Sequence, residues 1–252
     1  MKAGDTVKPD ELKVYRGNDF AVSDNIVIHH PTLDEICEYG ERDYFSMIHQ
    51  LCATPQTMKV QLWDMGIDYT TITPFELFYH LLCQLLPQEK TSILFGSLDF
   101  TRFEKCQNEE TDEPLLFQIV EHEPVIIDKT VYENMTDYIR QVHNIRKDEK
   151  MPANDTTKMI LIEDDREELE RNKHAEYHSQ LKNLVSSMIN SEGFKYNHAQ
   201  VWDMKINAFM DSVRRISHIK NAELLLQSGY SGFGINLKDI DKKQIDWLGE
   251  LT

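Results

Sequence analysis

The feature that most constrains the fold is a helix-start signal that recurs along the chain. In each case Thr or Asn is followed three residues later by Glu or Gln. In such a capping box the first side chain accepts a backbone N–H of the opening turn, and the second reaches back to the cap. The pairs are Thr32/Glu35, Thr73/Glu76, Thr130/Glu133 and Asn197/Gln200. The spacing predicts a chain built mainly from helices.

Apolar periodicity gives the approximate extent of the elements in the first half. We expect a helix after Thr32 that ends or bends at Gly40, followed by a second one that carries Tyr44 and Leu51. Further helices are predicted over residues 55–65, 73–86 and 130–146. Short apolar runs predict strands at Ile26–Ile28, Ser92–Phe95, Leu115–Val120 and Pro124–Ile127.

The second half reads as long helices. Residues 147–158, "KDEKMPANDTTK", have no periodic apolar signal. Helices over 163–190 and 197–227 carry near-heptad apolar seams and a short connection, which is typical of an antiparallel helical hairpin. The prediction is a mainly α fold with a small mixed α+β part. The domains expected are an N-terminal helical domain with short strands (1–147), a linker or exposed loop (148–158), and a C-terminal long antiparallel helical hairpin with an amphipathic tail (159–252).

Charge and cysteine usage restrict the class of protein. Forty-three acidic side chains against 27 basic ones give a formal net charge of −16, which disfavours nucleic-acid binding. No run approaches the ~18 apolar residues of a membrane span, and the N-terminus has no apolar signal-peptide core. The four cysteines form no C-x-x-C pair. These features predict a soluble cytosolic protein with reduced thiols.

Candidate chemical sites are few. His174 and His178 in "HAEYH" have the i, i+4 spacing of a helical zinc site, but Ala175 stands where a metalloprotease has its general-base Glu. His29 and His30 are adjacent, so on a strand they point to opposite faces. The loop "GYSGFG" (229–234) matches neither phosphate-binding glycine pattern. We therefore expect no enzyme activity, no metal site and no cofactor.

Apolar side chains in the C-terminal tail are the best candidates for partner binding, because the tail is too short to bury them alone. A short amphipathic helix is predicted here, with Ile245, Trp247, Leu248 and Leu251. The alternative is that this tail folds back onto the hairpin. The candidate partner-binding residues are Tyr230, Phe233, Trp247 and Leu248.

Three stretches carry a resemblance to a known family. They are "IVIHHPTLDEICEYGERDYFSMIHQLCATPQ", "ILFGSLDFTRFE" and "YSGFGINLKDIDKKQIDWLGEL". They resemble structural and assembly proteins of tailed bacteriophages of Gram-positive hosts, especially the tail assembly chaperones. The chain is longer than many of those chaperones, and its predicted strands in the middle depart from their helical pattern.

The resemblance implies a non-enzymatic protein that binds the helical tape measure protein, or other tail proteins, in the host bacterial cytoplasm. It leaves room for a homo-oligomer. Two alternatives stay open. One is a virion structural subunit of tail, neck or baseplate, which would be located in the virion. The other is a metal-dependent enzyme that uses His174 and His178.

Overall fold

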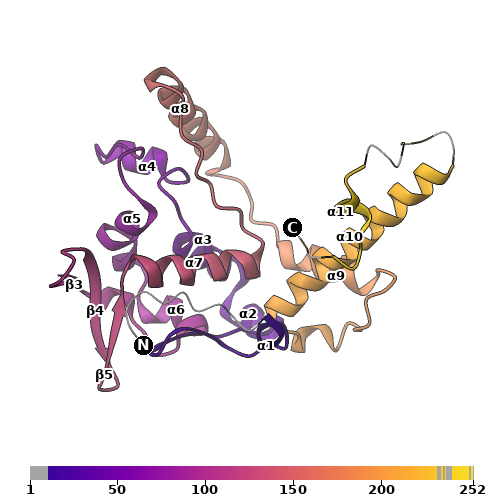
Figure 1. The fold of residues 1–252 in the computed structure, drawn as a ribbon, viewed down its shortest axis with the longest axis horizontal. Helices are drawn as coiled ribbons and strands as arrows, with labels where there is room; N and C mark the ends of the chain where they lie inside the picture. The colour runs from indigo at the N-terminus through magenta and orange to yellow at the C-terminus, as the bar shows by residue number, and fades with distance from the viewer. Residues whose placement is uncertain (1–10, 232–233, 235, 237–239, 250, 252) are drawn as a thin grey trace.

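A computed structural model describes residues 11–231, 234, 236, 240–249 and 251. Helices dominate these residues, and two small antiparallel sheets accompany them, so the predicted mainly α class with a small α+β part is confirmed (Figure 1). The helices are α1 Glu11–Tyr15, α2 Leu33–Tyr39, α3 Glu41–Leu51, α4 Lys59–Asp64, α5 Pro74–His80, α6 Gln88–Phe95, α7 Lys129–His143, α8 Asp155–Asn172, α9 Gln180–Ile189, α10 Ile206–Tyr230 and α11 Lys242–Ile245. Short 3₁₀ turns lie at η1 Leu82–Leu85, η2 Phe100–Arg102 and η3 Val201–Asp203.

The strands form two separate sheets. In the first, β1 (Phe20–Ser23) pairs with β2 (Ile26–Ile28); in the second, the order is β3 (Glu104–Gln107), β4 (Pro114–Val120), β5 (Glu123–Ile127). The predicted strands at 26–28, 115–120 and 124–127 are confirmed. The strand predicted at Ser92–Phe95 is wrong, because these residues form the last half of helix α6. An apolar run of four residues fits a buried helical turn as well as a strand.

Two of the four predicted capping boxes start helices as expected. At Thr32 and Thr73, the hydroxyl of each threonine accepts the backbone N–H three residues further on. The carboxylate of Glu35 or Glu76 in turn accepts the backbone N–H of the threonine. The prediction for Thr130 is wrong, because Asp128 caps α7 and accepts from Val131 N at 2.8 Å. The helix predicted from residue 55 begins only at Lys59.

The box at Asn197 and Gln200 forms both of its hydrogen bonds, at 3.2 and 3.1 Å. The helix that it was expected to start does not follow directly. The chain makes one turn and η3, and α10 begins at Ile206.

The core lies around α7. This 15-residue helix buries one face, including Tyr132, Met135 and Ile139, against α5, β1, β5 and α10. Phe78 of α5 has its ring 4.8 Å from that of Tyr132 and 5.8 Å from that of Phe100. These contacts make the predicted apolar helix after Thr73 a central element, although it breaks into α5 and η1 at Leu81.

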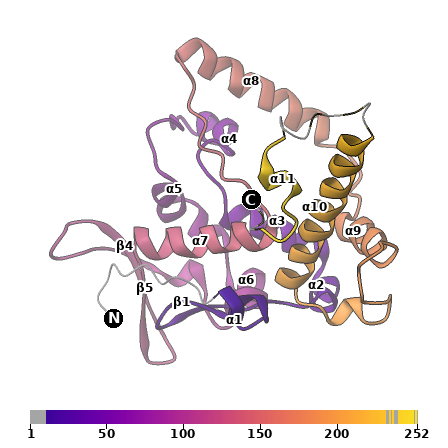
Figure 2. The ribbon, with the colours of Figure 1, turned by 45° about the vertical axis from the view of Figure 1, so that its right-hand side comes forward.

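The C-terminal helices differ in extent from the predicted hairpin. Helix α8 begins at Asp155, inside the segment expected to be a linker, and ends at Asn172. Residues 173–179 are not helical, so α9 is a separate ten-residue helix. Helix α11 stops at Ile245, so Trp247, Leu248 and Leu251 lie outside the helix predicted for them. The far end of α10 extends away from the α7 body (Figures 1 and 2).

The start of α10 is attached to the N-terminal part through the backbone. Ile206 N donates to Pro31 O at 2.9 Å, and Leu33 N donates to Met204 O at 3.0 Å. Thr32 and Lys205 thereby form an isolated antiparallel bridge. This junction places α10 beside α1 and α7.

Candidate functional site

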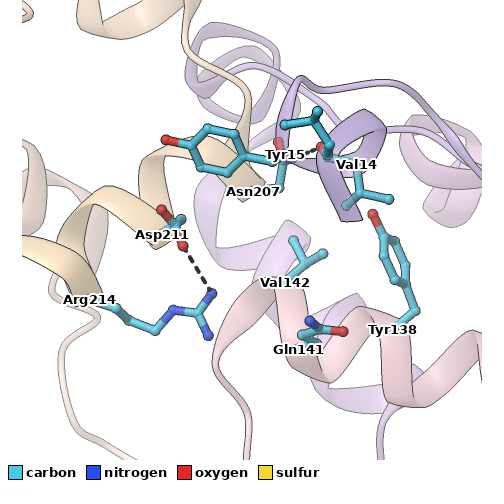
Figure 3. A pocket seen from close by; sticks show the side chains of 9 residues that line it. Val14, Tyr15, Tyr138, Gln141, Val142, Asn207, Asp211 and Arg214 are labelled. Carbon is cyan, nitrogen blue, oxygen red and sulfur yellow. Dashed lines mark hydrogen bonds and ion pairs between the residues drawn. The ribbon is translucent and has the colours of Figure 1, made fainter. Parts of the chain in front are cut away.

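A cavity of about 450 Å³ lies where α1, α7 and α10 meet (Figure 3). One wall is apolar and comes from α1 and α7. The opposite wall is polar and comes from α10. The lining residues are Leu12, Val14, Tyr15, Tyr138, Gln141, Val142, Asn207, Asp211 and Arg214. A volume of this order with a few polar groups fits a small ligand or the side chains of a partner.

Two polar side chains in the wall of the cavity, Asn207 and Arg214, each have a buried atom without a hydrogen-bond partner among the described residues. Asn207 donates through Nδ2 to Val14 O at 2.6 Å, while its buried Oδ1 has no partner among the described residues. Arg214 Nη2 lies 4.0 Å from Asp211 Oδ1, a loose ion pair, and the buried Arg214 Nε is also without a partner there. The Arg214 side chain is 28% exposed, so part of its guanidinium group is accessible in the cavity wall.

Two buried histidines border this region and stay neutral. His143 donates from Nδ1 to Ile139 O at 2.8 Å, and its Nε2 accepts from the Tyr44 hydroxyl at 2.7 Å. Burial lowers the pKa of His143 to about 4. His30 Nε2 is hydrogen-bonded to the hydroxyl of Tyr138, and burial also lowers the pKa of His30. Burial raises the pKa of Tyr138, so this pair is uncharged at neutral pH.

The histidines considered for a metal site are not brought together on a helix. His174 and His178 lie in the exposed, non-helical segment between α8 and α9, so the predicted shared helical face is wrong. Within the part of the chain that the structure describes, no three His, Cys, Asp or Glu side chains are grouped as a metal site would require. His29 and His30 diverge as expected: His29 is exposed and pairs with Asp19 at 2.7 Å, and His30 is buried.

The cysteines are free thiols, as expected. Cys52 and Cys83 are buried, and burial raises the pKa of both thiols. Cys37 is exposed, although its apolar neighbours in the sequence favoured a buried position.

Three of the four predicted partner-binding residues have exposed side chains. Tyr230 is 80% exposed, Leu248 75% and Trp247 50%. Phe233 lies outside the residues that the structure describes. Leu224 on α10 is also exposed, at 65%, and was not among the residues predicted for partner binding. Trp247 and Leu248 are adjacent in the tail, and we call this pair the C-terminal apolar surface.

The backbone of the tail is held on α10, which agrees with the fold-back alternative. Arg215 Nη1 donates to Trp247 O and to Gly249 O, both at 2.8 Å, and His218 Nε2 donates to Asp246 O at 3.1 Å. The folded-back tail leaves the side chain of Leu248 exposed and that of Trp247 half-exposed. Nothing in the sequence around Arg215 indicated that its side chain binds the backbone of the tail.

The comparisons with known proteins bear on this same part of the chain. Residues 171–252 match the family model described as the YomV second domain. YomV is a protein of a Bacillus phage region, so the C-terminal third of the chain is similar to a phage-associated domain. No curated protein and no solved structure matches the chain. Among the described residues, no helix is both long and apolar enough to span a membrane.

Proposed function

We propose that the chain is a non-enzymatic protein of phage tail morphogenesis, acting as a tail assembly chaperone that binds the helical tape measure protein in the host cytoplasm. The observation that carries the proposal is the C-terminal apolar surface. It lies within the region that matches a phage-associated domain, and its backbone is fixed while its side chains are uncovered.

The chemistry of this surface suits a helical client. Helix-in-groove recognition uses apolar anchors spaced three and four residues apart on the client. Trp247 and Leu248 are large apolar side chains held on a backbone that Arg215 and His218 already restrain. A pre-ordered contact surface loses less conformational entropy on binding than a free tail would.

The test is co-expression with the tape measure protein encoded in the same phage genome. We expect the client to remain in the supernatant and to co-purify with the chain. The double variant Trp247→Ala/Leu248→Ala should lose the client. A matched control is Ile119→Ala, because Ile119 is equally an exposed apolar residue, at 65%, but lies on β4. A client that is as soluble without the chain would contradict the proposal.

Mass spectrometry of purified particles separates this function from that of a virion subunit. A chaperone should be absent from mature virions. Recovery of the chain in particles at a fixed copy number would instead indicate a structural subunit of tail, neck or baseplate.

A further inference from the structure

Helix α8 is attached to the molecule in an unusual way. It has 18 residues, yet only Ile162 is buried. On either side it is flanked by segments without helix or strand, residues 145–154 and 173–179. Apolar packing, which holds most surface helices in place, is therefore confined to one position of α8.

Charge pairs supply the remaining contacts. They join α8 to residues 59–69, which contain α4 and the turn after it, and we call these residues the α4 segment. Lys158 Nζ lies 2.8 Å from Asp68 Oδ2. Arg166 contacts both carboxylate oxygens of Asp64, at 2.6 and 3.2 Å. Lys59 and Asp165 form a third pair.

The signs of these charges fix how α8 docks. The α4 segment contributes one cation and two anions, and α8 contributes two cations and one anion. A shift of α8 by four residues would break all three pairs, so the charge pattern favours one register. The pKa of Asp68 is lowered to about 2, mainly because its carboxylate accepts a hydrogen bond from the Lys158 ammonium. Hydrogen bonds from Thr70 contribute further to the lowering.

Two buried side chains of the α4 segment, Tyr69 and Lys59, interact with charged groups of α8. Tyr69, in the α4 segment, is 1% exposed, and the charges of Lys158 and Asp165 act on its hydroxyl. Lys59 is also buried, and it has Asp165 as its ion-pair partner. Lifting α8 would remove the ion-pair partner of the Lys59 ammonium and the charges that act on the Tyr69 hydroxyl.

We propose that α8 is a strap held on the α4 segment by charge, which lifts as one unit while the α7 core stays folded. Ion pairs of this kind are individually weak and are screened by salt, whereas the packing of the core is not. Local opening of such a unit occurs at a lower free energy than global unfolding. The strap does not depend on the proposed function.

Hydrogen exchange followed by mass spectrometry tests the proposal on the full chain. Between about 0.1 M and about 1 M NaCl the Debye length falls from about 10 Å to about 3 Å. A lifted α8 is an isolated helix of marginal stability, so its backbone hydrogen bonds open. We expect exchange across 155–172 to become about tenfold faster over that range, while exchange in α7 is unchanged. Equal protection of α8 at both salt concentrations would overturn the proposal.

Charge reversal provides the matched control. Arg166→Asp and Asp64→Arg should each speed α8 exchange at low salt by about tenfold. The double variant, which restores an opposite-charge pair, should return most of the protection. Both side chains are at the surface, so neither change disturbs the core. If the double variant stays as open as the single ones, or if α8 exchanges only together with α7, the strap is wrong.

Discussion

The body around α7 and the helices that follow it use apolar residues in opposite ways. Helix α7 buries eight of its 15 residues, including Tyr132 and Ile139. Helix α10, with 25 residues, buries four, and α8 buries one. The first region is stabilised by a shared core, to which the start of α10 adds Ile206 and Phe209. Helix α8 is attached mainly by ion pairs, and the far end of α10 leaves the large apolar side chains of Leu224 and Tyr230 exposed. Most of the buried apolar side chains therefore lie in the first region.

The largest expected effect is in the body. Phe78 is fully buried between Tyr132 and Phe100, so Phe78→Ala removes a ring and leaves a cavity. We expect the free energy of unfolding to fall by about 3–5 kcal/mol in urea titration. A loss below about 1 kcal/mol would mean that the body is not the stable region.

Acid should also destabilise the body through His143. Its folded pKa is about 4 and its ordinary value 6.5, so between these values the unfolded state binds a proton that the folded state does not. Stability is therefore lost as the pH falls from 6.5 to 4, by about 3 kcal/mol from this residue alone. His143→Gln should flatten the pH dependence, measured by urea titration at several pH values. The control His178→Gln, in an exposed segment, should leave it unchanged.

Helix caps occur both in the body around α7 and at the start of α8. Thr73 caps α5 in the body, and Asn154 caps α8. Thr73→Ala should lower the free energy of global unfolding by about 1 kcal/mol. Asn154→Ala removes an equivalent bond, from Thr157 N at 2.8 Å, but should change only the hydrogen exchange of α8. Equal global effects would show that α8 unfolds with the body.

The smallest effect is expected at an exposed apolar residue of α10. Leu224 is 65% exposed, so Leu224→Ala removes few contacts. The free energy of unfolding should change by less than about 0.5 kcal/mol. A larger loss in urea titration would mean that the far end of α10 has a structural role in the free chain.

Local signals in the sequence predicted much of the fold. The capping boxes at Thr32 and Thr73, and the strands at 26–28, 115–120 and 124–127, follow from side-chain chemistry within a few residues. The errors occur where local signals were ambiguous. "SILF" at 92–95 suits either element, and its helix is decided by what packs around it. The first residues of α8 lie in or next to the segment without a periodic apolar signal, so the helix was expected eight residues too late. It begins at Asp155 because Asn154 caps it.

The sequence also predicted part of the candidate site. Trp247 and Leu248 are apolar residues in a short tail, which was enough to expect exposure, whereas Tyr230 is exposed at the end of the long helix α10. The cavity between α1, α7 and α10 was not predictable, because its walls come from residues nearly 200 positions apart in the chain, such as Val14 and Asn207. The role of Arg215 was hidden for the same reason.

The sequence by itself determined that this chain is mainly helical, where several of its helices start, and that it carries a strongly acidic net charge. These properties depend on hydrogen bonds, periodicity and charge within a few residues. Only the tertiary structure decided which apolar side chains are covered, where α8 attaches, and how the tail lies on α10. Those outcomes depend on contacts between distant segments, and no local pattern encodes which distant partner a side chain will meet.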